Sequence, residues 1–157
     1  MKASFKAGKF QFHLGRREKL LLLEILKLYP RIPATHHQLS KSAGLPDAAA
    51  SQRLLDEALA EQRAESKKKL KALLTNPRQV QDTETGCRLL LAPPEVEWLL
   101  QILNDIRVGS WINLGSPELK LEISLLNEKT APDFWAMEWA GHFQMQFLQA
   151  LDGRMET

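Results

Sequence analysis

The pattern of apolar and polar positions predicts two short β-strands. Residues 9–14 alternate between polar and apolar side chains and include two phenylalanines, which is typical of a strand with one buried face. Residues 87–91 form a second short apolar stretch that we also assign to a strand. A two-stranded ribbon is marginal alone but stable when helices cover it, so we expect these strands to pair beneath helices.

Each predicted strand leads directly into an apolar helix. Residues 10–26 and 87–103 therefore align without a gap as a weak strand–helix repeat. Glu18 and Glu95 occupy equivalent places in the first helical turns, where the helix dipole favours a negative charge. We expect both helices to lie against the ribbon.

Helical spacing of apolar residues, together with capping residues, prolines and glycines, predicts that most of the remaining chain is helical. The expected helices cover residues 16–29, 35–44, 48–74, 98–108, 117–129 and 133–151, with a turn or loop at 78–86. The predicted fold is mainly α: a single domain of 157 residues built as a helical bundle with a small two-stranded β-ribbon near residues 9–14 and 87–91.

The last predicted helix is unusually apolar. Met137, Met145, Phe147 and Leu148 belong to one broad apolar side, which leaves a narrow polar stripe. Such a helix is typical of the centre of a bundle or of a subunit interface. We expect it to be core, and it offers a surface for a homodimer.

Composition is that of an ordinary globular protein, with 44% hydrophobic and 25% charged residues. The single cysteine, Cys87, excludes an internal disulfide or a cysteine-cluster metal site and suits a reducing compartment. The N-terminal leucine run is interrupted by charges and lacks a cleavage site, and no stretch is long enough to span a bilayer. We therefore expect a cytoplasmic protein that does not bind membranes.

Charge is unevenly distributed although the net charge is only +2. Residues 1–78 form a basic half with 16 lysines and arginines against 7 acidic residues, and residues 79–157 form an acidic half with 5 against 12. Two arrangements fit this pattern: the halves face each other within the fold or a dimer, or the basic half faces nucleic acid. We favour the first.

The most distinctive cluster is Asn104, Asp105, Arg107 and Trp111, around the glycine at which we expect the helix to end. If the helix continued past Gly109, Asn104, Arg107 and Trp111 would share one face. Arg107 could then bind a carboxylate or phosphate beside Trp111. Alternatively, Asp105 and Arg107 brace the helix end and Trp111 fills the core.

This stretch resembles a bacterial family of unknown function that is best represented in actinobacteria. The family signature is a helix of the pattern W-L-x-x-L-N-D-L-R-L-x-L-G, and the resemblance covers about residues 95–115. The matching residues are Trp98, Leu99, Leu103, Asn104, Asp105, Arg107, Leu114 and Gly115. Ile106 and the run Gly109–Trp111 depart from the pattern. The resemblance implies a mainly helical cytoplasmic protein, and some relatives are encoded beside an adaptor of the Clp protease, which implies a link to protein turnover.

Other candidates for chemistry are sparse. Glu138 and His142 stand four residues apart and could form an acid–base pair or half a metal site, but we expect a pair that stabilises the helix. Cys87 has no partner histidine motif and is expected to be a small buried hydrophobe. Phosphate-binding loops, nucleophile elbows and paired carboxylates are not found in the sequence. We therefore expect no enzymatic activity, no cofactor and no bound metal.

The alternative function is DNA binding by a helix-turn-helix or winged-helix arrangement in residues 35–63. In that case Ser51, Gln52 and Arg53 are the residues that would contact nucleic acid. The residues that follow weaken this hypothesis, because the segment in the place of a wing carries Asp82 and Glu84, which phosphates would repel.

We predict from the sequence a non-enzymatic interaction or regulatory module. A protein partner is favoured over nucleic acid, and the predicted contact surface is Asn104, Asp105, Arg107 and Trp111.

Overall fold

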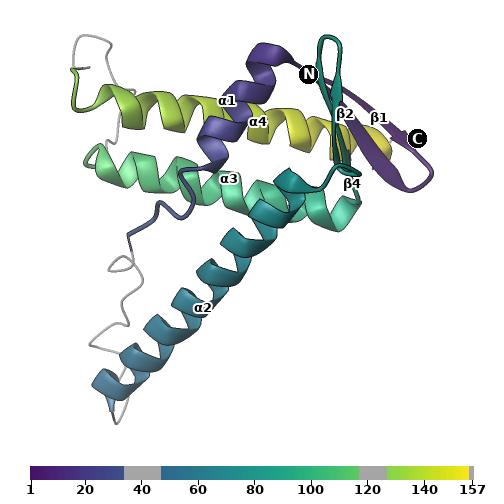
Figure 1. The fold of residues 1–157 in the computed structure, drawn as a ribbon. Helices are drawn as coiled ribbons and strands as arrows, with labels where there is room; N and C mark the ends of the chain where they lie inside the picture. Colours follow the sequence, from purple (N-terminus) through teal and green to yellow (C-terminus); the bar gives the residue numbers. More distant parts are fainter. Residues whose placement is uncertain (34–46, 117–126, 156–157) are drawn as a thin grey trace.

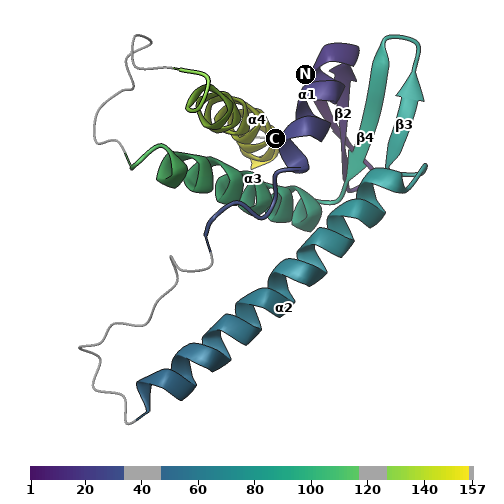
Figure 2. The same cartoon turned by 60° about the vertical axis from the view of Figure 1, so that its left-hand side comes forward.

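The structure is a computed structural model that describes residues 1–33, 47–116 and 127–155. The described elements are β1 (Lys2–Lys6), β2 (Lys9–Gly15), α1 (Arg16–Leu26), α2 (Ala48–Thr75), β3 (Val80–Thr83), β4 (Gly86–Leu91), α3 (Pro93–Asn113) and α4 (Ala131–Met155). Helices α3 and α4 lie side by side, the sheet stands at one end of this pair, and α2 projects from the body (Figures 1 and 2).

The predicted bundle with a two-stranded ribbon is wrong, because the described residues contain a four-stranded antiparallel sheet of order β1-β2-β4-β3. The expected pairing of the two central strands is correct, with Phe12 opposite Leu89. The sequence prediction missed both edge strands. In β1 every residue is exposed, and β3 has no fully buried residue, so neither carries the alternation that marks a half-buried strand.

The edge strands are held by tight hairpin turns. Ala7 and Gly8 both have positive φ, at 53° and 79°, as the two central residues of a type I′ turn require. Lys6 therefore pairs with Lys9 across a two-residue loop. The segment expected to be a turn or loop at 78–86 instead contains β3 and the turn into β4.

The strand–helix repeat has a common local cause. The carboxylate of Glu18 accepts a hydrogen bond from the N–H of Gly15 at 3.1 Å, and Glu95 accepts one from the N–H of Ala92 at 3.0 Å. Each glutamate lies three residues into its helix and makes one half of a capping box, because its carboxylate accepts from the N-cap N–H while Gly15 and Ala92 have no polar side chain to cap in return. The two predicted first-turn glutamates thus make equivalent contacts.

The core lies on one face of the sheet. Alternate residues of β2 and β4 are buried there, and residues of α1, α3 and α4 pack against them. The ring of Phe12 meets Phe147 of α4 edge-on, with centroids 4.9 Å apart. The largest fully buried side chains are Phe10, Phe12, Phe143, Phe147, Leu26, Leu91, Leu99, Leu103 and Ile106.

Helix α3 does not end at Gly109, as the sequence prediction had it, but continues to Asn113. Gly109 is buried within the helix, and its lack of a side chain serves packing rather than termination. A Cβ at this position would lie 2.4 Å from the carbonyl carbon of Arg31. The glycine therefore allows the backbone of another segment to touch the helix.

Helix α4 covers the predicted final helix and extends past Gly153 to Met155. Its buried side is formed by Ala136, Ala140, Phe143 and Phe147. Met145 and Leu148, expected to be core, are 59% and 48% exposed.

Helix α2 begins as predicted, with the Asp47 carboxylate accepting a hydrogen bond from the N–H of Ala50 at 3.2 Å. Among its 28 residues, Leu70 and Leu73 near the C-terminal end are the buried ones. The rest of the helix extends away from the sheet and from the α3–α4 pair (Figure 2).

The predicted helix at 35–44 and most of the one at 117–129 lie outside the described residues. Among the helices that are described, none is long and apolar enough to cross a membrane.

Candidate functional site: a groove between α3 and α4

Asp105 is a structural brace. Its carboxylate accepts hydrogen bonds from the backbone N–H groups of Arg31, at 2.7 Å, and Ile32, at 3.3 Å. These two N–H groups belong to residues 31–33, which lie outside helices and strands, so a side chain supplies the acceptor that a regular element would provide. One member of the predicted contact cluster thus fixes the backbone of residues 31–32 to α3.

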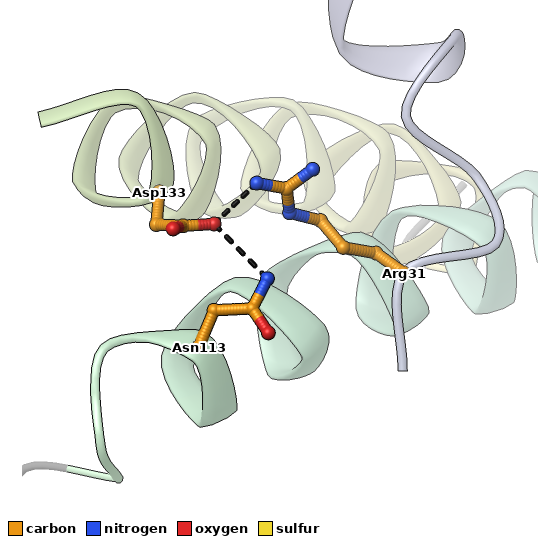
Figure 3. Close-up of polar contacts among 3 residues, drawn as sticks. All are labelled: Arg31, Asn113 and Asp133. Atoms are coloured by element: carbon orange, nitrogen blue, oxygen red, sulfur yellow. Dashed lines mark hydrogen bonds and ion pairs between the residues drawn. The ribbon is translucent and has the colours of Figure 1, made fainter. Parts of the chain in front are cut away.

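The same segment is fixed from two further directions. The Arg31 guanidinium forms an ion pair with Asp133 at the start of α4, and Asn113 at the end of α3 donates to the same carboxylate oxygen at 3.2 Å (Figure 3). Arg63 of α2 donates to the carbonyl oxygen of Ile32 at 2.6 Å. Arg31 and Ile32 therefore join α2, α3 and α4.

On another face, α3 and α4 form an open groove with a volume of about 770 Å³. Both helices supply its lining, which is more apolar than polar. The lining residues are Arg107, Val108 and Trp111 of α3 and Met137, Glu138, Gly141, His142 and Met145 of α4. The groove brings together two candidate pairs that the sequence analysis had treated separately, Arg107 with Trp111 and Glu138 with His142.

Arg107 is the exposed cation of this groove. Its Cδ lies 3.7 Å from where a Cβ of Gly141 would be, so its aliphatic stem crosses the groove where α4 has no side chain. Within the described part of the chain, its guanidinium makes no hydrogen bond and no ion pair. Glu138 and His142 also line the groove, but neither bonds to Arg107, so its guanidinium, unpaired among the described residues, is suited to bind a carboxylate or phosphate from another molecule.

The rim of the groove exposes large apolar side chains. Trp111 is 38% and Met145 is 59% exposed, and both line the groove. Trp135 and Leu148, elsewhere on α4, are 56% and 48% exposed. Within the groove, Trp111, Met145 and Arg107 are of residue types that are enriched at protein interfaces.

Glu138 and His142 are both exposed on α4. The His142 ring meets the Trp139 ring edge-on, with centroids 5.3 Å apart, rather than bonding to Glu138. In the described residues no group of three or more histidine, cysteine or acidic side chains could hold a metal ion. Glu138 and His142 are therefore separate surface side chains of the groove and not a hydrogen-bonded pair.

The predicted contact cluster divides accordingly. Arg107 and Trp111 line the groove, Asp105 braces the segment at residues 31–32, and Asn104 is exposed but does not line the groove. The sequence analysis did not identify Met137, Gly141 and Met145 as groove residues. The spacing of Arg107 and Trp111, four residues apart on α3, was the available signal, and it required the helix to pass Gly109.

Cys87 is buried in β4. Burial raises the pKa of its thiol above the usual value, so the sulfur is held protonated and unreactive.

The residues of the DNA-binding alternative lie near the start of α2. Arg53 is exposed, whereas Ser51 and Gln52 are half-buried, and the Gln52 side chain donates to Asp56 at 2.8 Å. The β3–β4 hairpin does follow α2, as a wing would. Its Asp82 is bound to Lys19 at 2.6 Å, and that hydrogen bond raises the pKa of Lys19.

Comparisons with family models, curated proteins and solved structures gave no match to this chain.

Proposed function

We propose that this protein is a non-enzymatic interaction module that binds a protein partner in the groove between α3 and α4. The observation that carries the proposal is the Arg107 guanidinium, which has no partner in the described structure and projects among exposed apolar side chains. The resemblance noted above leads us to place this module in the control of protein turnover.

The chemistry of the groove supports a peptide partner with an acidic residue and apolar neighbours. Trp111 and Met145 offer exposed apolar surface. Covering this surface stabilises a complex by about 25 cal/mol per Å² of apolar area buried. Arg107 adds selectivity, because a partner that buries it without supplying a negative group leaves a charge unpaired.

The test is capture from a native bacterial lysate with tagged wild-type protein and an Arg107→Ala variant, each with and without nuclease. We expect a protein that wild type retains and Arg107→Ala loses, independent of nuclease. Arg17→Ala is the matched control, since it removes an exposed arginine of α1 from outside the groove, and Arg53→Ala tests the DNA-binding alternative.

Melting temperatures of the variants exclude unfolding as the cause. If Arg53→Ala rather than Arg107→Ala loses the captured material, and nuclease removes it, then the DNA-binding alternative is supported and the groove proposal fails.

A further inference from the structure

Helix α2 presents an unpaired face in the same chain that carries an open groove. Leu54 is 68% exposed, and Ala58, one turn later, is exposed as well. Most of the stability of a helix in a protein comes from packing of its apolar face against the rest of the fold. In α2 the buried residues are confined to the last turns. Among the described residues nothing covers the Leu54 side of this part of α2, whereas Leu55 and Leu59 on its other side are half-buried.

The charges on this face are acidic. Three exposed glutamates share this side of the helix: Glu57, Glu61 and Glu65. With 3.6 residues per turn, each lies within about 60° of Leu54 or Ala58 around the helix axis. None of the three forms an ion pair with another described residue. The face thus combines an apolar anchor with acidic side chains.

The groove has the complementary composition. Trp111 and Met145 provide apolar walls, and Arg107 provides a cation beside Gly141 that pairs with no other described residue. Glu138 stands about one turn along α4 from Gly141, and α2 carries the exposed Arg53 one turn before Glu57. Each surface therefore offers opposite charges about one helical turn apart.

We propose that the occupant of the groove is the N-terminal part of α2 from a second copy of this chain. Leu54 packs between Trp111 and Met145, and Glu57 and Glu61 face Arg107. Exchange in both directions gives a dimer with two identical contacts, as a twofold axis requires. This inference rests on the proposed function of the groove and names the occupant.

Sedimentation equilibrium of the full chain over a range of concentrations tests the proposal. We expect a monomer–dimer equilibrium in wild type that Leu54→Glu and Arg107→Glu each weaken at least tenfold. Leu20→Glu on α1 is the matched control, because Leu20 is 62% exposed and lies outside both surfaces. The control should dimerise like wild type, and circular dichroism should show all variants folded.

A charge exchange identifies the contact. The double variant Glu57→Lys, Glu61→Lys should also be monomeric. Mixing it with Arg107→Glu should restore the dimer, because one contact then joins the introduced lysines to the introduced glutamate and the other is the original pair.

The proposal is overturned if wild type stays monomeric up to a protein concentration of about 1 mM, which corresponds to a dimerisation free energy weaker than about −4 kcal/mol. It is also overturned by a dimer that Leu54→Glu does not weaken, or by mixtures that stay monomeric. A monomeric wild type whose lysate partner is still lost in Arg107→Ala would end this inference and leave the proposed function intact. A dimer with the expected variant pattern and no lysate partner would support self-association and end the function as proposed.

Discussion

The carboxylate of Asp105 on α3 accepts a 2.7 Å hydrogen bond from the backbone N–H of Arg31, 74 residues earlier in the chain. The neighbouring N–H of Ile32 bonds to the same oxygen. The Asp105 carboxylate thus replaces the acceptors that a helix or strand would supply to these two N–H groups. One helical turn later, Gly109 leaves room for the backbone of the same two residues.

Replacing Asp105 with alanine should lower stability without affecting the groove. Two partly buried N–H groups would lose a charged acceptor, which we expect to cost about 2 kcal/mol or more in free energy of unfolding. The melting temperature should fall by about 4–8 °C. Asn104→Ala, at the exposed neighbouring position, is the control, and an equal loss there would contradict the brace.

Gly109 of α3 and Gly141 of α4 should respond in opposite ways to substitution by alanine. At Gly109 the added Cβ would meet Arg31 and Ile32 backbone atoms at 2.4–2.6 Å, and relieving that overlap should cost about 2 kcal/mol or more. At Gly141 the nearest atom is 3.7 Å away, an ordinary contact, and alanine should add up to about 1 kcal/mol through its helix propensity. Chemical denaturation of both variants measures the contrast, and similar effects would refute the close approach at Gly109.

The pH dependence of stability should contain a contribution from Glu18. Burial raises the pKa of this carboxyl, but the Met1 ammonium, 2.7 Å away, and the Gly15 N–H outweigh burial and hold the pKa below its usual value of 4.5. A lowered folded-state pKa means that the stabilisation is fully present above pH 4.5 and is lost as pH falls through the folded-state value.

Glu18→Gln should therefore lower the unfolding free energy at pH 7 and reduce its decline in acid. Denaturation curves between pH 7 and pH 3 measure this, with Glu97→Gln as an exposed control. Parallel pH profiles for wild type and Glu18→Gln would be inconsistent with the role of the ion pair.

Cys87 should resist alkylation in the folded protein. The buried thiol has a raised pKa, so little thiolate is present at pH 8 and reagents reach it only on opening of the core. The rate of reaction with iodoacetamide should rise with the population of unfolded molecules in denaturant. Rapid modification without denaturant would show that β4 is accessible.

Features that depend on neighbours in sequence could be predicted. The central strands, the Asp47 cap and the equivalent glutamates at positions 18 and 95 rest on local patterns. The pairing of the two strands is long-range and was inferred because a ribbon is stable only beneath helices. The edge strand β1 could not be found in this way, because its pairing to β2 comes from a turn at Ala7 and Gly8 rather than from buried side chains.

The site could be predicted only in part. Arg107 and Trp111 were identified, but the groove also needs α4, whose position beside α3 is a long-range relationship. Gly109 was interpreted as a helix end because glycine commonly has that place, whereas here it accommodates a backbone crossing that local sequence does not encode.

Arg31 and Ile32 have a mechanical consequence for the molecule. The Arg31 side chain bonds to α4, its backbone bonds to α3, and the next carbonyl accepts the bond from Arg63 of α2. A ligand that separates α3 from α4 at the groove must therefore strain the contacts of Arg31 and Ile32, which also hold α2. Strain at the groove therefore reaches α2 through Arg31 and Ile32, two residues that belong to no helix.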